Sequence, residues 1–151
     1  MPAQGKRILV VDDDATARRT LERFLTREGF SVTTAANANE GLLAVQVDQP
    51  EIVLSDIYMP GMTGLELQAK IREFAPQINV LLMTGQDDMP TTVQAMQQGA
   101  YDYLTKPIDL ERLKMILSRL IETQQLSEEL DLIKQSEAEE YKLENILVDN
   151  G

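Results

Sequence analysis

In the segment Ile52-Val53-Leu54-Ser55-Asp56, an almost continuous apolar run ends at a carboxylate. A second run, Ile8-Leu9-Val10-Val11, ends at Asp12-Asp13-Asp14 in the same way. Continuous apolar runs are typical of strands that are covered on both faces, as in parallel sheets. An unpaired carboxylate is costly to bury in such a core, so we expect it where the strand ends. The two runs therefore predict strands whose acidic residues meet at one edge of a sheet.

Strand-like and helix-like segments alternate five times along the chain. The expected strands are residues 7–11, 32–36, 52–55, 80–83 and 101–104. Such alternation predicts an α/β fold, a doubly wound five-stranded parallel sheet with helices on both faces. In folds of this kind, ligands bind beyond the carboxyl ends of the strands, which is where the acidic residues lie.

The segments between the strands carry signals for helix starts and helix ends. Residues that favour a start are Asp14, Asn37, Thr63, Pro90 and Asp109, and glycines that favour an end are Gly29 and Gly99. Glu40 and Glu66 follow two of these starts at the spacing of a capping box. In the third helix we expect Leu65, Ala69 and Ile71 to begin the inward-facing stripe.

The chain is strongly acidic, and its charge is unevenly distributed. The net charge is -11, and residues 122–149, with nine acidic and two basic residues, carry -7 of it. Such a surface disfavours direct nucleic-acid binding, which depends on clustered lysine and arginine. The chain has no cysteine and no histidine, which excludes disulfides, thiolate metal sites and imidazole chemistry. Because neither a membrane-spanning run nor a signal-peptide core is found, we expect a cytoplasmic protein.

A helix-forming segment follows the globular unit, which we expect to end near residue 121. Leu126, Leu130 and Ile133 form an apolar edge in this segment, and the polar residues 137–140 interrupt that edge. Residues 122–151 are therefore predicted to form an acidic helical linker or extension. A coiled coil is the alternative that the broken pattern leaves open.

Polar side chains follow four of the predicted strands. Asp12 and Asp13 follow the first strand, Asp56 the third, Thr84 the fourth and Lys106 the fifth. Clustered carboxylates repel one another unless a hard cation such as Mg²⁺ binds to their oxygens. A hydroxyl and a lysine beside them suit phosphoryl transfer, which depends on positioning and charge neutralisation. A carboxylate can itself be the nucleophile in such a transfer, which gives an aspartyl-phosphate.

Four motifs at these strand ends occur in a fixed order. They are Val10-Val11-Asp12-Asp13-Asp14, residues 54–64, Met83-Thr84-Gly85 and residues 99–107. With these motifs, residues 6–121 resemble the receiver domain of response regulators in two-component signalling. The resemblance implies a flavodoxin-like sheet with the strand order 2-1-3-4-5.

The same resemblance implies a phosphoacceptor and a metal site. Asp56 would accept a phosphoryl group from a phosphohistidine of a sensor histidine kinase. Asp12, Asp13 and Asp56, together with the backbone carbonyl of Tyr58, would hold Mg²⁺. The domain would catalyse its own phosphoryl transfer and dephosphorylation without being a conventional enzyme.

Three further residues would read the phosphorylated state in this family. Lys106 and Thr84 would contact the phosphoryl oxygens, and Tyr103 would rotate inward as a switch. The Lys106–Pro107 peptide bond would be cis, which proline allows at low cost. The face made by the fourth helix, the fifth strand and the fifth helix would transmit the change.

The stretch Gln86-Asp87-Asp88-Met89-Pro90 further resembles receivers of sigma-54-dependent activators of the nitrogen-regulator class. The resemblance implies a homodimer through the fourth and fifth helices and the extension, with control of transcription by an output domain. We expect that output domain to lie outside this chain, which we interpret as a fragment of a longer protein. The alternative is a stand-alone or kinase/sensor-linked receiver that acts through protein–protein contacts.

Three other readings fit the residues less well. A phosphatase of the haloacid dehalogenase type needs an acid two residues after its nucleophile, where this chain has Tyr58. A flavin-binding electron carrier needs a Ser/Thr/Gly-rich phosphate loop after the first strand, where this chain has Asp12-Asp13-Asp14. A degenerate receiver that serves only as a binding module would lack Asp56 or Lys106.

Overall fold

The computed structural model describes residues 5–85 and 87–149. The chain divides into two units, Met1–Lys114 and Met115–Gly151. The first unit contains the sheet and the helices that cover it. The second unit is helical, because the last helix continues through it as far as Asp149.

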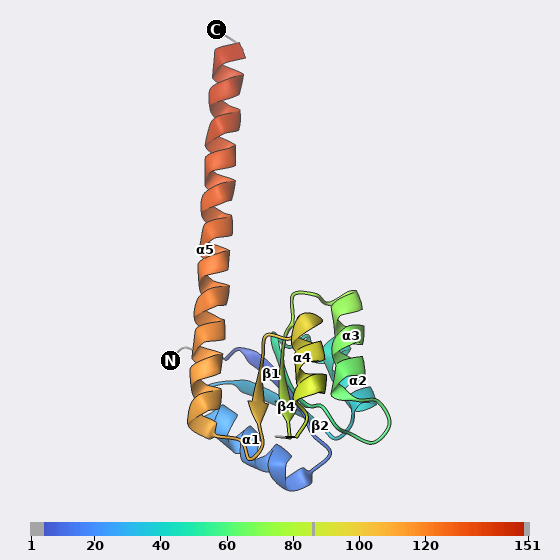
Figure 1. Cartoon of the computed structure of the whole chain (residues 1–151). Coiled ribbons are helices and arrows are strands. Elements are labelled where there is room, and N and C mark those ends of the chain that lie inside the picture. The colour runs from blue at the N-terminus through green and yellow to red at the C-terminus, as the bar shows by residue number, and fades with distance from the viewer. Residues whose placement is uncertain (1–4, 86, 150–151) are drawn as a thin grey trace. The chain divides into compact units, whose positions relative to one another are not determined.

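Strands and helices alternate through the described residues, as the sequence predicts (Figure 1). The elements are β1 (Arg7–Val11), α1 (Ala15–Arg27), β2 (Ser31–Ala35), α2 (Ala38–Asp48), β3 (Ile52–Asp56), α3 (Gly64–Phe74), β4 (Asn79–Thr84), α4 (Met89–Gln97), β5 (Asp102–Thr105) and α5 (Leu110–Asp149).

All five strands are parallel, and their order is β2-β1-β3-β4-β5. This order confirms the predicted doubly wound sheet. β1 and β3 lie in the interior of the sheet, and β3 is buried along its whole length. Leu9, Val53 and Leu82 pack with residues of α2, α3 and α4 in one core layer. Because side chains alternate along a strand, the neighbouring residues Ile8, Val10, Leu54 and Leu81 face the opposite layer.

β3 extends one residue beyond the carboxyl end of its predicted range, and β4 extends one residue beyond its predicted range at each end. Asp56 pairs with Met83, and Thr84 pairs with Thr105, so both polar residues are the last residues of their strands. β2 and β5 are each displaced by one residue from the predicted range. Backbone pairing with a neighbouring strand sets these ends, and it does not depend on the side chain being apolar.

The predicted helix starts are present. Backbone N–H groups donate to Asp14 Oδ1 at 2.9 Å, to Asn37 Oδ1 at 2.9 Å and to Thr63 Oγ1 at 3.2 Å. The predicted capping box at Asn37 differs in one bond, because Glu40 accepts from the N–H of Ala36 rather than from the cap residue. Gly29 and Gly99 follow α1 and α4 with φ of 99° and 106°, a conformation that favours glycine.

The predicted inward face of α3 is wrong in part. Ala69 is exposed and Leu65 only partly buried, whereas Leu67 and Ile71 are fully buried one turn apart. Gln68 is also buried, which the apolar pattern could not indicate. Ala69 lies two residues from Leu67 and from Ile71, and such neighbours point away from each other on a helix.

α5 continues as one helix through the described residues of the extension. Leu126, Leu130 and Ile133 are exposed, so they remain an accessible apolar edge. The boundary near residue 121 stays a prediction, and residues 150 and 151 lie outside the described part. Of the helices described, none combines the length and the apolar character needed to cross a bilayer.

Candidate functional site

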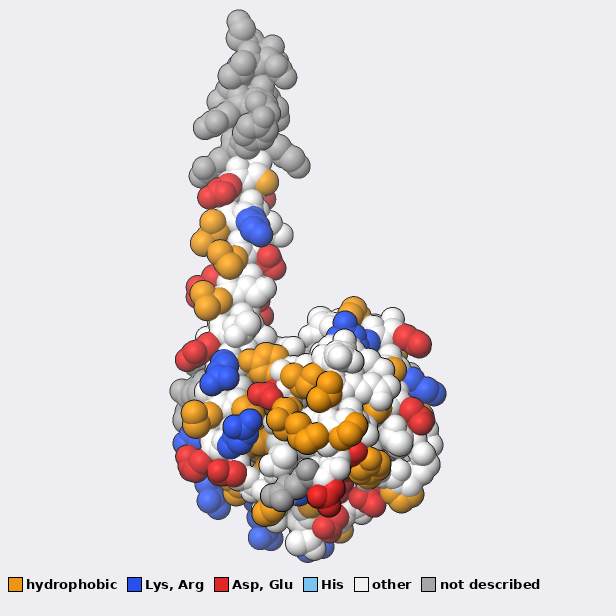
Figure 2. Space-filling view, viewed as in Figure 1, with side chains coloured by type: hydrophobic (Ala, Val, Ile, Leu, Met, Phe, Trp, Pro, Cys, Tyr) orange, Lys and Arg blue, Asp and Glu red, His pale blue; other side chains and the backbone are white. Residues whose placement is uncertain are grey.

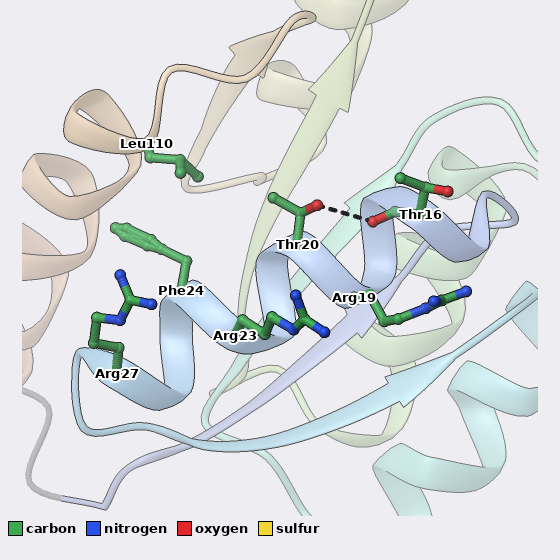
Figure 3. A pocket seen from close by; sticks show the side chains of 7 residues that line it. All are labelled: Thr16, Arg19, Thr20, Arg23, Phe24, Arg27 and Leu110. Carbon is green, nitrogen blue, oxygen red and sulfur yellow. Dashed lines mark hydrogen bonds between the residues drawn. The ribbon is translucent and has the colours of Figure 1, made fainter.

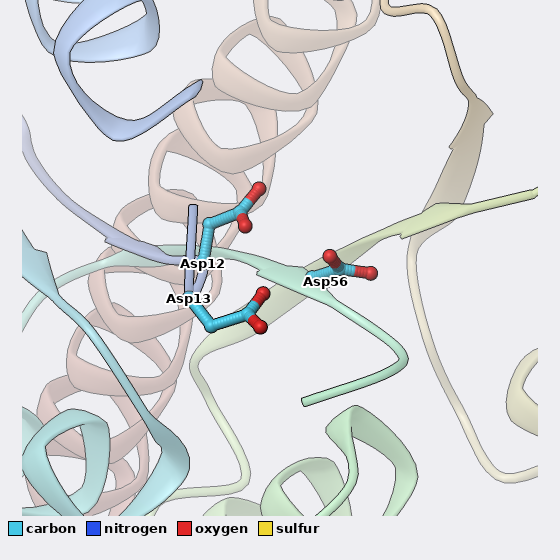
Figure 4. A group of neighbouring side chains, drawn as sticks. All are labelled: Asp12, Asp13 and Asp56. Carbon is cyan, nitrogen blue, oxygen red and sulfur yellow. The ribbon is translucent and has the colours of Figure 1, made fainter. Parts of the chain in front are cut away.

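Three carboxylates meet at the carboxyl edge of the sheet. Asp12 and Asp13 follow β1, and Asp56 ends β3, the strand that pairs with β1. One carboxylate oxygen from each lies within 4.8 Å of the others, and Figure 4 shows the three groups around one space. Asp12 and Asp56 are buried and Asp13 is exposed, so the cluster opens to solvent on one side.

Lys106, which follows β5, reaches into this acidic cluster. Its Nζ lies 2.6 Å from Asp56 Oδ2 and 3.8 Å from Asp12 Oδ2. Burial alone would lower the pKa of Lys106, but the hydrogen bond and charge of Asp56, with Asp12 and Asp13, raise it above its ordinary value. Lys106 therefore supplies a fixed positive charge beside Asp56. The bond from Lys106 to Pro107 is cis, as expected.

Asp12 shows why the cluster suits a cation. Burial raises the pKa of its carboxyl group, and the nearby charges of Asp56 and Asp13 add to that effect, while the Asp14 N–H and Lys106 oppose it. Oδ1 accepts the Asp14 N–H at 2.9 Å, but Oδ2 is buried and has no hydrogen-bond partner among the described residues. A hard divalent ion would satisfy that oxygen, and an all-oxygen donor set fits Mg²⁺.

The backbone around Asp56 is tightly arranged. The N–H of Tyr58 donates to Asp56 Oδ1 at 3.2 Å. Gly64, the first residue of α3, donates to the carbonyl of Ile57 at 2.7 Å. A Cβ at Gly64 would overlap the Asp56 carbonyl oxygen and lie 2.8 Å from Ile57 Cα. A side-chain-free residue thus lets α3 start directly against the Asp56 backbone, while the predicted metal-binding role of the Tyr58 carbonyl stays a prediction.

Thr84 is close to the cluster in the sheet but is engaged elsewhere. Its side chain is fully buried, its hydroxyl donates to the Gly85 carbonyl at 3.2 Å, and it accepts from the Thr92 hydroxyl at 3.1 Å. Among the described residues, no hydrogen bond joins Thr84 to Asp56. Tyr103 is half-buried and packs against the core layer beneath α2, α3 and α4. Its role as a switch is not tested by this arrangement.

Sequence reasoning missed three residues near the cluster. Thr92 on α4 contacts Thr84, Arg18 on α1 donates to the Asp12 carbonyl at 2.6 Å, and Gly64 packs against Asp56. Thr92 and Arg18 are polar residues within helices, so apolar periodicity gives no signal for them. Gly64 could have been noticed, because glycine at a helix start often marks a close backbone approach. Gln86 lies outside the described residues.

A groove of about 350 Å³ along α1 is separate from the carboxylates (Figure 3). Arg19, Arg23 and Arg27 line it at four-residue spacing, so they share one face of the helix. Phe24 and Leu110 supply apolar walls, and Thr20 is turned back onto the Thr16 carbonyl at 3.0 Å. The chain is therefore acidic overall but carries a local strip of guanidinium groups on this face of α1.

Comparison with known proteins agrees with this geometry. Residues 8–118 match the family described as response regulator receiver domain. The chain is 45% identical over 112 residues to the DNA-binding transcriptional regulator NtrC of Klebsiella pneumoniae, covering 74% of this chain and 24% of that protein. It is 40% identical over 119 residues to the C4-dicarboxylate transport transcriptional regulatory protein DctD of Rhizobium meliloti, covering 79% and 26%. The expected likeness to the nitrogen-regulator class is thereby confirmed.

Solved structures give the same result. The receiver domain of NtrX from Brucella abortus superposes with a TM-score of 0.73 at 35% identity, covering 77% of this chain and 98% of that one. The chain spans about a quarter of the length of the curated relatives it matches. The match to the family covers most of the chain and includes residues of every strand of the sheet. The chain therefore belongs to the response regulator receiver domain family.

Proposed function

We propose that Asp56 accepts a phosphoryl group from a phosphohistidine of a sensor histidine kinase, in a two-component pathway. The observation that carries the proposal is the arrangement of Asp56, with Lys106 Nζ at 2.6 Å and the oxygens of Asp12 and Asp13 within 4.8 Å. The Asp56 carboxylate is the nucleophile, and its negative charge is already balanced by Lys106. Positioning and charge neutralisation are the main demands of phosphoryl transfer.

Mg²⁺ is the cofactor that the donor set fits. Asp12, Asp13 and Asp56, with the Tyr58 carbonyl, would hold it. The buried Oδ2 of Asp12 supports this assignment, because it accepts no hydrogen bond from the described residues. When bound, the ion would neutralise charge on the phosphoryl oxygens. Asp13 is the exposed member of the cluster, so it is the carboxylate through which an ion would enter from solvent.

Lys106 and Thr84 would then bind the phosphoryl oxygens, with Tyr103 following Thr84 inward. A phosphorylated Asp56 adds charge and strong acceptor oxygens beside a lysine. Phosphorylation can shift the population from the resting to the active conformation if their free energies differ by only a few kcal/mol. The face formed by α4, β5 and α5 would carry the change outward.

The output is proposed from the relatives and from one exposed surface. NtrC and DctD are named as transcriptional regulators, and we infer that this receiver controls an output domain of the same kind in the cytoplasm. Residues 122–151 would act as the linker after a receiver domain of residues 6–121.

Met89, Val93 and Met96 expose an apolar strip on α4, and Figure 2 shows hydrophobic side chains gathered there. That strip supports a homodimer through α4 and α5.

Intact-mass spectrometry after incubation with acetyl phosphate and Mg²⁺ tests the phosphoacceptor. We expect one added phosphoryl group in the wild-type chain and none in Asp56→Asn. Asp48→Asn is a matched control, because Asp48 is an exposed carboxylate at the end of α2. A chelator should abolish the adduct in the wild type, and Asp13→Asn should raise the Mg²⁺ concentration required. An adduct that survives Asp56→Asn would overturn the assignment.

Light scattering at micromolar concentration, with and without phosphorylation, tests the dimer. Val93→Glu should shift the mass toward that of one chain, because it places a charge in the apolar strip of α4. Val47→Glu is the matched control, since Val47 is an exposed valine on α2. A mass of one chain in every state of the wild type would contradict the proposed dimer.

A further inference from the structure

Thr92 is a polar residue on the inner side of α4, and its surroundings are unusual for a helical threonine. It is 1% exposed, and its hydroxyl oxygen lies 3.1 Å from the hydroxyl oxygen of Thr84, which is 0% exposed. The two threonines come from different elements, the end of β4 and the second turn of α4. A buried hydroxyl pair of this kind has a defined geometry, because water does not compete for it.

The Thr84 hydroxyl is fully engaged in this arrangement. It accepts from Thr92 and donates to the Gly85 carbonyl at 3.2 Å. In the part of the chain that the structure describes, it makes no hydrogen bond to Asp56. The single proton of Thr84 must therefore leave the Gly85 carbonyl before the hydroxyl can donate to a phosphoryl oxygen, and movement of the side chain toward the sheet edge also breaks the contact with Thr92.

We propose that Thr92 is a positioning residue that holds the Thr84 hydroxyl in its resting place. This inference rests on the proposed function of Asp56 and Thr84. The contact with Thr92 and a bond to the phosphoryl group require different positions of the Thr84 hydroxyl, so the strength of the Thr92 contact sets how readily the domain switches. A phosphoryl oxygen that accepts the Thr84 proton in place of the Gly85 carbonyl favours the new position, because hydrogen bonds to an anion are stronger than those between neutral groups.

Release of Thr84 leaves no buried donor without a partner. The single hydroxyl proton of Thr92 has two acceptors, since the Asp88 carbonyl lies 2.9 Å away in the preceding turn. When Thr84 leaves, Thr92 donates to that carbonyl alone, as threonines within helices often do. The contact is therefore inexpensive to break, whereas an unsatisfied buried hydroxyl would make the switch too costly.

The contact also ties down a helix that has few other anchors. Of the described residues of α4, Thr92 and Ala95 are the buried ones. The Ala95 carbonyl accepts from Gln68 Nε2 on α3 at 3.1 Å, and Asp88 makes no side-chain capping bond at the start of α4. Loss of the contact with Thr84 thus removes one of the two hydrogen bonds that, among the described residues, join the inner side of α4 to other elements.

Thr92→Val and Thr92→Ser separate a positioning role from simple packing. Valine keeps the size and shape of threonine but removes the hydroxyl, whereas serine keeps the hydroxyl and removes the methyl group. The readout is the affinity of each variant for beryllium fluoride with Mg²⁺, which mimics a phosphoryl group on a carboxylate. We expect Thr92→Val to bind the mimic about fivefold more tightly, the worth of one neutral hydrogen bond, and Thr92→Ser to resemble the wild type.

A second arm tests whether the effect acts through Thr84. In a Thr84→Val background the hydroxyl pair no longer exists, so adding Thr92→Val should change the affinity by less than about twofold, as a double-mutant cycle requires. Methyl NMR without any phosphoryl mimic gives an independent reading. The Thr84 methyl resonance should shift in Thr92→Val and stay near its wild-type position in Thr92→Ser.

The outcomes distinguish this inference from the function on which it rests. If the wild-type chain neither binds the mimic nor takes a phosphoryl group from acetyl phosphate, both proposals are overturned. If the wild type binds but Thr92→Val binds equally well, only the role of Thr92 is overturned. The same holds if the Thr92→Val effect persists at full size in the Thr84→Val background. Thermal unfolding verifies that each variant is folded. If Thr92→Val folds poorly, Thr92→Ala and Thr92→Ser decide instead: Thr92→Ala should bind the mimic more tightly than the wild type, and Thr92→Ser should bind it equally well.

Discussion

Helices α3 and α4 follow the strands that carry Asp56 and Thr84, yet the domain holds them very differently. α3 starts with a side-chain cap from Thr63 and buries Leu67, Gln68 and Ile71. α4 starts at Asp88 with no side-chain cap, buries Thr92 and Ala95, and turns larger apolar residues outward. The proposed phosphoacceptor is thus backed by a firmly attached helix, and the proposed switch residue by a weakly attached one.

The difference has a physical consequence for motion. Local opening is easiest where few apolar contacts are buried, and stability within a domain varies accordingly. An acceptor needs fixed geometry, because small displacements of reacting groups cost rate. A readout element needs two arrangements of similar free energy. The two helices, which follow adjacent strands of one sheet, would meet the opposite needs of the proposed acceptor and the proposed switch.

Truncation of buried side chains should show the largest contrast. Leu67→Ala removes a fully buried side chain of α3 and should lower the free energy of unfolding by about 2–5 kcal/mol. Val93→Ala truncates the exposed strip of α4 and should change it by no more than about 0.5 kcal/mol. Urea unfolding monitored by circular dichroism measures both. Equal losses in the two variants would mean that α4 is held as firmly as α3.

Gly64, which begins α3, and Gly85, which precedes α4, differ in the space around them. A Cβ at Gly64 would meet the backbone of Asp56 and Ile57, which cannot move aside as a flexible side chain could. Gly64→Ala should therefore cost about 1–3 kcal/mol, as overpacking does. Gly85, before α4, has open space around the position of a Cβ, so Gly85→Ala should be close to neutral.

Urea unfolding of the two alanine variants decides this prediction, and Gly85→Ala serves as the internal control. A neutral Gly64→Ala would show that α3 can move away from Asp56, and so remove the basis for calling this side of the site fixed.

The sequence predicted the sheet well because its strands are covered on both faces. The runs that end at Asp12 and Asp56 are apolar at nearly every position, so neither could be confused with a surface strand. Strand order and parallel pairing then follow from the resemblance, and the carboxylates meet at the carboxyl edge as expected.

The helices were less predictable, and α4 shows why. Met89, Val93 and Met96 recur at the spacing of a helical stripe, which normally marks a core face. In the structure these residues face outward, and the inner side holds Thr92 and Ala95. The apolar pattern that usually marks a core face thus lies on an exposed surface of α4. The contact from Thr92 to Thr84 depends on that reversal, so periodicity alone could not have found it.

Removing the buried charge of Asp12 should stabilise the domain, and the effect should be smaller than the losses expected for Leu67→Ala and Gly64→Ala. Burial raises the pKa of Asp12, so the folded chain binds a proton more tightly there than the unfolded chain does. The ionised carboxylate then costs stability at neutral pH in the absence of a cation. Asp12→Asn should raise the melting temperature by several degrees at neutral pH in a chelating buffer, as relief of a buried charge does.

The pH dependence of this gain has a definite direction. The cost is fully present above the raised pKa of folded Asp12, and it disappears as the pH falls below the ordinary carboxyl value of 3.8. The difference in melting temperature between Asp12→Asn and the wild type should therefore shrink on acidification. Saturating Mg²⁺ should reverse the order, because only the wild type keeps the carboxylate for the ion. A gain independent of pH would contradict the electrostatic origin.

The residues that precede α3 and α4, Thr63 and Asp88, should show the smallest difference in the free energy of unfolding. Thr63 accepts the Glu66 N–H at 3.2 Å, so Thr63→Ala should lose about 1 kcal/mol, the usual worth of such a cap. Asp88 caps nothing with its side chain, and its buried Oδ2 has no hydrogen-bond partner among the described residues. Asp88→Ala should therefore leave the free energy of unfolding unchanged or slightly raised, as measured by urea unfolding. If Asp88→Ala lost as much free energy of unfolding as Thr63→Ala, the Asp88 side chain would stabilise the start of α4. Thr92 would then no longer be one of the few residues that hold this helix.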